Sequence, residues 1–529
     1  MTTRATFPTL SWLPMTIAGI LAIAINSNSV LASDPPKQSE DELQKAVQRA
    51  PKDADALCDY AEFLANEKKD YDRAEQLFKQ AIAAEPKHAR AAYKYANLLK
   101  NQRKDLDGAE KYFKRAIEAD PNHVLALNNY AVLLQFERND IDGAERLFKR
   151  ALEVDPRFSH ALGNYAALLN DSRDDPKASE TLYKRAIEAE PTSARYLASY
   201  ACLLAGKLHD REGAAVKLDQ ALKMAPNDVW VIYDNAWFRE FWREDFDRAE
   251  ELYSRALEID PKNVKVLTGY SAFKAKRRHD DAAAEKLTLR AVEADPKAPL
   301  PLFNYAWMLE FRHKDYAAAE VYYKKAIDAN PHFADAMNNL ARMLEKRVKN
   351  RAAAEPYYKL AIESDPKHVG ALTGYASFLE KGPDDSHVEV LYRQLIAADP
   401  KVANSHANFA RFLIAHEKFG EALTELDTAF ALLAKTPDKS TELECRFYAF
   451  AQRPAAARPD ALEGLKQLLI VDRARSENWD LSKVVSAATA AGHPDAKWLP
   501  KLAAVVNNNA STDTLDAWPA WAAIAVRMK

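Results

Sequence analysis

Cysteine and glycine are scarce in this chain. The three cysteines, Cys58, Cys202 and Cys445, lie far apart among 529 residues and form no CxxC pair, so neither a disulfide framework nor a zinc site is indicated. Only 13 glycines are present, and a chain so poor in glycine has few tight turns. At 48% hydrophobic residues, it can nevertheless bury a large apolar surface.

The sequence also lacks the short motifs that mark common active sites. It contains no phosphate-cradling Gly-rich loop, no HExxH, no GxSxG and no EF-hand loop. The formal net charge of -3 gives no strong bias toward nucleic acid or anionic membranes. We therefore expect no catalytic residue, no metal, no cofactor and no nucleic-acid partner.

What the chain has in abundance is internal repetition. Prolines recur in steps of 35 residues, and Pro400 follows one residue early, after positions 51, 86, 121, 156, 191, 226, 261, 296, 331 and 366. So regular a period is typical of stacked repeats. Because each repeat packs only on its neighbours, a chain of this length need not divide into several globular domains.

Within one repeat, residues 124 to 158, the apolar residues follow a helical spacing twice. One face comprises Leu127, Tyr130, Ala131 and Leu134, and the other comprises Ala144, Leu147, Phe148 and Ala151. Two short helices are therefore expected. An aspartate at the break should accept hydrogen bonds from the first N–H groups of the second helix. Such aspartates are Asp70, Asp105, Asp140, Asp175, Asp210, Asp245 and Asp315.

The second helix should end before the repeat proline, because a residue that precedes proline disfavours the α conformation. Glu and Lys recur four residues apart on this helix, as in Glu75/Lys79 and Glu110/Lys114. Each such pair adds only about 0.2–0.5 kcal/mol. We therefore expect these pairs to mark the solvated face, without holding the repeats together.

These residues resemble the tetratricopeptide repeat (TPR). That family places large, small and large apolar residues on its first helix, then small, aromatic and small residues and a proline. The corresponding series here is Tyr130, Ala131, Leu134, Ala144, Phe148, Ala151 and Pro156. Most repeats carry one residue more than the family norm between the two helices.

The resemblance covers roughly residues 51 to 434. It implies an all-α fold, a right-handed α-solenoid (superhelix) of about eleven TPR-like helix pairs with a helical C-terminal cap. It also implies a non-enzymatic scaffold or adaptor that binds an extended peptide or a partner protein in a concave groove built from the first helices.

Residues 1–33 carry a single charge, Arg4, and an apolar run from Met15 to Ile25. This pattern indicates a signal peptide cleaved after Ala32, and hence export to the periplasm or outside. An uncleaved membrane anchor or an organelle transit peptide are the alternatives. Residues 34–45 should form a flexible lead-in, and residues 46–434 the repeat array.

Residues 435–529 differ from the array. Residues 442–451 and 460–470 should form one more divergent helix pair, followed by four tryptophans, Trp479, Trp498, Trp518 and Trp521. This segment resembles a C-terminal extension found in some bacterial TPR proteins, and that resemblance implies no known activity. We expect a helical cap in which the tryptophans close the end of the array. A catalytic or small-ligand role for His493 is a minor alternative.

Partner-binding residues should lie where the first helices vary between repeats. The position before the large apolar residue carries asparagine five times, at Asn129, Asn164, Asn304, Asn339 and Asn408, and Ser199, Asp234, Gly269 or Gly374 elsewhere. In some TPR superhelices a ladder of asparagines holds the backbone of a peptide, since a carboxamide offers both a donor and an acceptor. The alternative is that these side chains bond to neighbouring helices or to water.

A second variable stripe lies two and six residues after the large apolar position, where side chains four apart share a helix face. The pairs are Trp237 with Phe241, Ala272 with Lys276, Trp307 with Phe311, and Arg342 with Lys346. We predict that this stripe binds a segment with aromatic or acidic side chains. Alternatively, the rings fill gaps between first helices.

Histidines also follow the repeat proline, at His88, His123 and His368. Equivalent positions in a solenoid lie about a repeat width apart, so they cannot share one metal, and we interpret them as residues that begin a helix. Two other functions stay open: an RNA-associated array of half-a-TPR type, which residues 375–379 with Leu391 and Tyr392 also resemble, and an enzyme whose site lies in the C-terminal segment. The oligomeric state is unknown.

Overall fold

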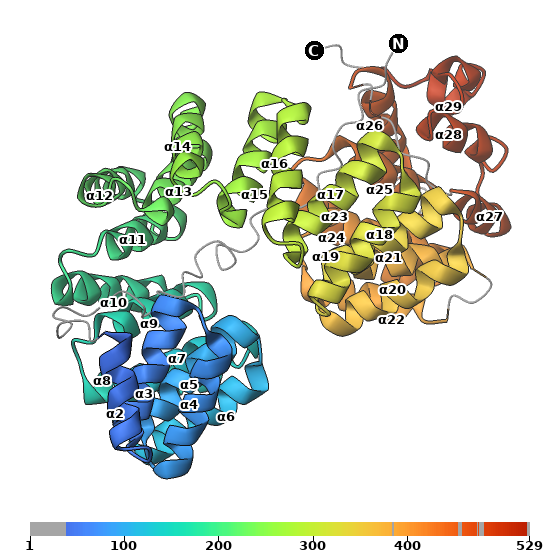
Figure 1. Cartoon of the computed structure of the whole chain (residues 1–529). Helices are drawn as coiled ribbons and strands as arrows, with labels where there is room; N and C mark the ends of the chain where they lie inside the picture. Colours follow the sequence, from blue (N-terminus) through green and yellow to red (C-terminus); the bar gives the residue numbers. More distant parts are fainter. Residues whose placement is uncertain (1–38, 383–385, 453–457, 473, 475–480, 526–529) are drawn as a thin grey trace. The chain divides into compact units, whose positions relative to one another are not determined.

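The computed structural model describes residues 39–382, 386–452, 458–472, 474 and 481–525, and within these ranges every regular element is a helix (Figure 1). The chain divides into two compact units, Met1–Leu287 and Thr288–Lys529. The helices come in successive pairs within each unit, and the all-α fold of TPR-like pairs is confirmed.

In the first unit the first helix packs against the second in each of the first six pairs named below, and each of these six pairs packs on the helix that follows it. The pairs are α3 Ala54–Phe63 with α4 Tyr71–Ala84, α5 Ala89–Leu98 with α6 Leu106–Ala119, α7 Val124–Glu137 with α8 Ile141–Val154, α9 Ser159–Asp171 with α10 Pro176–Ala189, α11 Ala194–Gly206 with α12 Arg211–Met224, α13 Val229–Phe238 with α14 Phe246–Ile259, and α15 Val264–Phe273 with α16 Asp281–Ala294. The boundary between the two units falls within α16.

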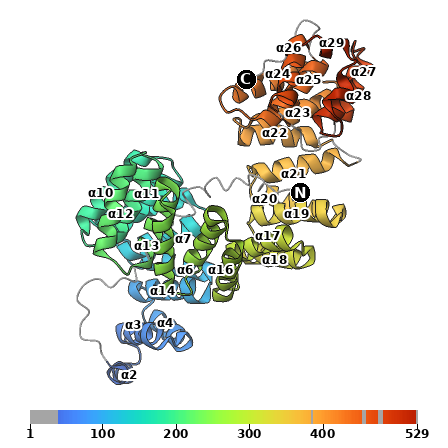
Figure 2. The same ribbon diagram turned by 90° about the horizontal axis from the view of Figure 1, so that it is seen from above.

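The second unit continues with four pairs, and Figure 2 shows α18 to α22 following one another in chain order. The pairs are α17 Pro299–Met308 with α18 Tyr316–Ala329, α19 Ala334–Met343 with α20 Arg351–Ser364, α21 Val369–Glu380 with α22 Val388–Ala398, and α23 Ala403–Ala415 with α24 Phe419–Leu433. The signature residues are packing residues throughout; Ala131 and Phe148, for example, are fully buried.

Seven repeats use the aspartate caps that the sequence predicts. All seven expected aspartates accept a hydrogen bond from a backbone N–H in the first turn of the second helix, and Pro176 occupies the first turn of α10. The second helices end where expected; Asp120 and Asp155, which precede prolines, both have extended backbones. The histidine prediction is confirmed as well. His88, His123 and His368 begin α5, α7 and α21, and Nδ1 of each accepts a backbone N–H three residues on.

The additional residue between the two helices lies in a widened turn. In six repeats the first helix ends in a π-helical segment; these are η1 Leu64–Lys68, η2 Leu99–Arg103, η3 Arg239–Arg243, η4 Lys274–Arg278, η5 Leu309–His313 and η6 Leu344–Val348. One left-handed residue follows at a constant spacing, with φ between 52° and 63°, at Lys69, Lys104, Asn139, Asp174, His209, Glu244, His279, Lys314 and Lys349. None of these is the glycine that this conformation favours.

The Glu–Lys pairs of the second helices do more than we expected. The Glu110 carboxylate accepts a hydrogen bond from Lys114 at 2.7 Å. It also accepts hydrogen bonds from the Tyr130 hydroxyl at 3.2 Å and from the Arg138 Nε at 3.0 Å. Both of these donors belong to the next repeat. The expectation that the pairs only mark a solvated face is therefore wrong, because the glutamate joins adjacent repeats.

Part of the expected flexible lead-in, residues 34–45, is helical. Ser39 accepts the Glu42 N–H and Glu42 accepts the Ser39 N–H, a capping box that begins α2, Glu40–Arg49. This S-x-x-E pattern at residues 39–42 was the missed signal. The predicted signal peptide lies outside the described residues, as do residues 34–38. None of the described helices is long and apolar enough to span a bilayer.

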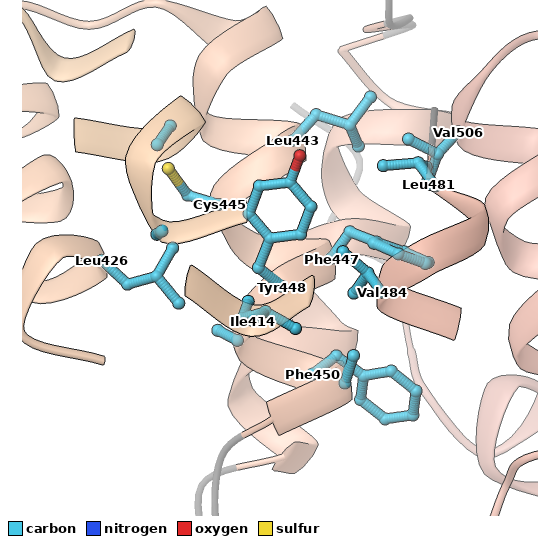
Figure 3. Packing of buried hydrophobic residues seen from close by; sticks show 14 of the residues in the cluster. Ile414, Leu426, Leu443, Cys445, Phe447, Tyr448, Phe450, Leu481, Val484 and Val506 are labelled. Atoms are coloured by element: carbon cyan, nitrogen blue, oxygen red, sulfur yellow. The ribbon is translucent and has the colours of Figure 1, made fainter. Parts of the chain in front are cut away.

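The C-terminal segment contains the expected helix pair, α25 Lys439–Gln452 and α26 Arg458–Ile470, followed by α27 Ser482–Ala490, α28 Leu499–Val506, η8 Thr512–Leu515 and α29 Pro519–Ala522. Its apolar residues form one cluster with those of α21 to α24. Figure 3 shows Ile414, Phe447 and Val484 of α23, α25 and α27 within that cluster. The segment therefore continues the core of the last repeats.

Three tryptophans of this segment stack in sequence. The Trp498 and Trp518 rings lie 5.8 Å apart, and the Trp518 and Trp521 rings lie 6.4 Å apart. His493 links the same region to α25: its Nε2 lies 3.1 Å from the Phe450 carbonyl, while its Nδ1 accepts the Asp495 N–H. Both ring nitrogens thus have a structural partner. Trp479 lies outside the described residues.

Glu444 of α25 is fully buried, and desolvation raises the pKa of its carboxyl to about 7. It accepts the Tyr448 hydroxyl, whereas its Oε2 has no hydrogen-bond partner among the described residues. The nearby charges are Arg411, which lowers this pKa, and Glu380 and Asp438, which raise it.

Glu444→Gln should stabilise the chain at pH 8 and have little effect at pH 5. The unfolded carboxyl ionises above its ordinary pKa of 4.5, while the folded one stays neutral to about pH 7. Wild-type stability therefore falls as the pH rises through that window, and glutamine removes the loss. Melting temperatures of both proteins across the pH range test this; an equal shift at pH 5 and pH 8 would contradict it.

Lys314→Gly should raise the free energy of unfolding by about 1 kcal/mol, because a left-handed residue with a Cβ costs roughly 1–2 kcal/mol and glycine largely avoids that cost. Lys314→Ala keeps the Cβ and should bring no gain, which makes it the matched control. Urea unfolding of the three proteins measures the difference. Equal stability of the Gly and Ala variants would show that the turn is unstrained.

Candidate functional site

The predicted aromatic and cationic residues lie where the first helices widen into π-helical turns. Trp237 is in α13 and Phe241 in η3, while Trp307 is in α17 and Phe311 in η5. The cationic residues are distributed in the same way: Lys276 is in η4, Arg342 in α19 and Lys346 in η6. The unit boundary separates these residues into two groups.

The first aromatic patch consists of Trp237, Phe241 and Arg277. The Trp237 and Phe241 rings lie 5.1 Å apart, and the Arg277 guanidinium carbon lies 5.1 Å from the centre of the Phe241 ring. Phe241 is 43% exposed and Trp237 is half-buried. Neither ring is fully buried in the core. Arg277, from the next repeat, completes the patch, and the sequence stripe did not include it.

The second aromatic patch consists of Trp307, Phe311, Arg342 and Arg347. Its rings are again 5.1 Å apart, and the two arginines lie 5.3 and 5.9 Å from the Phe311 ring. Trp307 and Phe311 are half-buried. The spacing to the first patch is 70 residues for each ring and for Arg277 and Arg347, so the same arrangement recurs two repeats later.

The second patch carries excess positive charge. Lys346 is exposed, and its neighbours include Arg342, Arg347 and Lys381. Desolvation and these three cations lower the pKa of the Lys346 ammonium, with Glu345 acting in the opposite direction. Arg342 adds a buried Nη2 that has no acceptor within hydrogen-bonding distance among the described residues. Such a surface favours anionic groups.

The asparagines of the first unit bond to one another across three first helices. Asn164 donates to the Asn128 Oδ1 at 3.0 Å, Asn128 donates to the Asn129 Oδ1 at 3.0 Å, and Asn129 donates to the Asn97 Oδ1 at 2.9 Å. Asn129 and Asn164 are only 9% and 3% exposed. A peptide backbone could reach them only by breaking these bonds.

The helices that carry this network have little free surface. Every residue from Ala126 to Gln135 in α7 is buried, as is every residue from Tyr196 to Ala205 in α11. In the repeats around α7 to α11, the inner face of the first helices is therefore covered. After α11, an accessible surface appears at α13 and η3, where Trp237 and Phe241 lie.

The remaining asparagines of the predicted ladder differ from one another. Asn304 and Asn408 are half-buried, and Asn339 is 2% exposed with no acceptor for its Nδ2 among the described residues. The two glycines that interrupt the ladder have a steric cause. A Cβ at Gly269 would lie 2.8 Å from the Tyr233 ring, and one at Gly374 would lie 2.7 Å from the Tyr358 ring.

Sequence reasoning missed a set of buried or half-buried glutamates one residue before the second position of the stripe. Each accepts a hydrogen bond from a tyrosine of the following helix, at 2.8 to 3.0 Å; the pairs are Glu240 with Tyr253, Glu310 with Tyr323, Glu345 with Tyr358, and Glu380 with Tyr392. The partners are 13 residues apart, or 12 in the shortened repeat. That recurring spacing was the available signal.

No group of three His, Cys, Asp or Glu side chains in the described ranges is arranged to hold a metal ion. The two aromatic patches offer ring faces, guanidinium groups and an ammonium group. These groups suit recognition of another molecule's aromatic and acidic side chains.

Models of the tetratricopeptide repeat match residues 65–127, 112–146, 131–194 and 306–369. Searching the curated proteins gives no match to this sequence.

Among solved structures, the chain is similar to human IFIT1, solved as a dimer with PPP-AAAA, at 17% identity over 76% of this chain and 96% of that one, with a TM-score of 0.42. Yeast Tom70 is similar at 16% identity over 79% and 96%, with a TM-score of 0.41. YrrB, a TPR protein with an unusual peptide-binding site, matches 36% of this chain and 95% of its own at 19% identity, with a TM-score of 0.25.

Asn128→Ala should destabilise the first unit by about 1–3 kcal/mol. The substitution removes the hydrogen bond that the Asn129 Oδ1 accepts from Asn128 and the one that the Asn164 side-chain amide donates to Asn128, and both groups are buried. Asn304→Ala, at a half-buried position, is the matched control and should cost little. Urea unfolding measures both. An Asn128 variant as stable as wild type would show that the network is dispensable and would favour the peptide ladder.

Proposed function

Because the chain belongs to the tetratricopeptide repeat family, we propose that it is a non-enzymatic scaffold that binds an extended segment of a partner protein. The two aromatic patches are the proposed contact surfaces. The observation that carries this proposal is their recurrence: a Trp–Phe pair with an arginine on the Phe ring occurs twice, at a spacing of two repeats.

Packing alone does not account for these rings. The regular packing positions of the repeats are alanines and aromatics with almost no exposure, whereas Phe241 is 43% exposed and the other three rings are half-buried. Other repeats place Val132, Ala167 and Cys202 at the position of Trp237 and Trp307, so the fold does not need tryptophan there. Large, partly exposed rings are typical of surfaces that bind another protein.

The charge around the rings favours an acidic segment. Arg277 lies on the first patch, and Arg342, Lys346 and Arg347 lie on the second. A guanidinium can bind a carboxylate with two parallel hydrogen bonds, and an aromatic side chain of the partner can pack on the accessible ring surface. We therefore propose a segment in which carboxylates alternate with aromatic side chains.

The asparagines at 129, 164, 304, 339 and 408 remain a weaker candidate. Asn129 and Asn164 are engaged in the buried network, so we assign the main contact to the aromatic patches. Asn304 precedes Trp307 by three residues on α17 and could bind the backbone of a segment docked on the second patch.

Two fluorescein-labelled probe peptides test the proposal: an acidic probe in which Glu-Asp pairs alternate with Trp, and a basic probe with Lys-Arg in place of Glu-Asp. Wild type should bind the acidic probe at least tenfold more tightly. Replacement of Trp237, Phe241, Trp307 and Phe311 together by alanine should weaken acidic-probe binding by more than tenfold, since anchor rings typically contribute at least 2 kcal/mol in total. Fluorescence anisotropy measures both.

The matched control replaces four exposed apolar residues of second helices by alanine, namely Val216, Ile259, Val321 and Leu360, which are 41% to 63% exposed. Its binding should equal that of wild type. Circular dichroism and the melting temperature should be nearly unchanged in both quadruple variants. If the variant without the rings unfolds, the rings are packing residues; if it binds like wild type, the partner surface lies elsewhere.

A further inference from the structure

Both aromatic patches contain a buried carboxylate beneath the arginine. Glu240 is 2% exposed and Glu310 is 3% exposed. On one side, each accepts the hydroxyl of a buried tyrosine, from Tyr253 at 3.0 Å and from Tyr323 at 2.9 Å. The tyrosines belong to the second helices α14 and α18, so each carboxylate is fixed from within its own repeat.

On the other side, each carboxylate faces an arginine of the next repeat. The Arg277 Nε lies 3.3 Å from the Glu240 Oε1, and the Arg342 Nη2 lies 4.0 Å from the Glu310 Oε1. The same two guanidinium groups lie 5.1 and 5.3 Å from the Phe241 and Phe311 rings. Each arginine thus lies between a carboxylate and a ring: Arg277 donates a hydrogen bond to its carboxylate, whereas Arg342 faces its carboxylate at ion-pair distance.

The repeat fold does not require these glutamates. In two earlier repeats the position of the glutamate is occupied by Lys100 and Gln135. The position of the tyrosine is occupied there by Phe113 and Phe148, which are fully buried and have no hydroxyl to donate to a carboxylate. Burying a carboxylate costs free energy unless charges and hydrogen bonds compensate. A glutamate with a tyrosine and an arginine is therefore an addition to the fold.

We propose that Glu240 and Glu310 are positioning residues of the partner-binding surface, each holding one arginine over the phenylalanine of its patch. This inference rests on the function proposed above. Arg277 faces Glu240 through its Nε and Arg342 faces Glu310 through its Nη2. The other N–H groups of each guanidinium are the donors that we assign to the partner.

Holding a long side chain in its binding conformation in advance reduces the entropy that binding must otherwise lose. For one arginine this corresponds to about three- to tenfold in the dissociation constant. The contribution should vanish when the arginine is absent, because the glutamate acts only through it.

The test measures binding of the acidic probe to the full chain with Glu310→Gln, Arg342→Met and the double variant. Glu310→Gln should weaken binding about three- to tenfold, and in the Arg342→Met background it should have no further effect. Glu240→Gln with Arg277→Met should behave alike. The control is Glu380→Gln, whose glutamate also accepts a tyrosine at 2.8 Å and an arginine at 2.7 Å but has no Trp–Phe pair beside it; its binding should match wild type.

Equal weakening in Glu310→Gln and Glu380→Gln, or additive effects of Glu310→Gln and Arg342→Met, would overturn the positioning role. If Glu310→Gln fails to fold, Arg342→Lys replaces it: this variant keeps the charge and the carboxylate but loses the planar guanidinium, and wild-type affinity would overturn the proposal. A wild-type chain that does not bind the acidic probe would instead refute the proposed function, and the positioning role with it.

Discussion

Every feature of this molecule depends on one constraint: each helix pair must bury its apolar face against the next pair. The contact is made by small residues, such as Ala131 and Ala144, which let a buried aromatic such as Phe148 approach the following helix. Because the step is 35 residues from Pro51 to Pro366, the same position meets equivalent neighbours in each of these repeats. A residue that changes between repeats is therefore free of this constraint, and the inner positions of the first helices vary most.

The local structure could be predicted closely because it depends on short-range physics. The aspartate caps, the helix ends before proline and the helix-starting histidines each involve contacts within about four residues, and all are present. The additional residue located the widened turn, but it did not reveal the turn's backbone conformation. Its left-handed positions are occupied by residues such as Lys314 and Glu244. Glycine at these positions would have indicated the left-handed conformation from the sequence.

The candidate site was harder to predict because its contacts cross repeats. The Trp–Phe pairs were found from their spacing within one helix, but Arg277 lies 36 residues after Phe241, and no local pattern connects them. The bond between Asn164 and Asn128 likewise spans 36 residues. Burial was equally hidden: an asparagine on an inner face looks accessible until the neighbouring helices are in place, and α7 and α11 turn out to be covered on all sides.

The covered stretch explains where the aromatic patches occur. Around α7 to α11 the inner positions carry small or amide side chains, such as Ala167 and Asn164, that pack together and bond to one another. In α13 and α17 tryptophan replaces them, and glutamates with tyrosine partners replace the amides deeper in the helix. The indole at this position is half-buried, so it contributes ring surface to the accessible face, and the buried carboxylate near it faces an arginine there. The same repeat thus builds a sealed wall or a charged aromatic surface, according to the side chains at two or three inner positions.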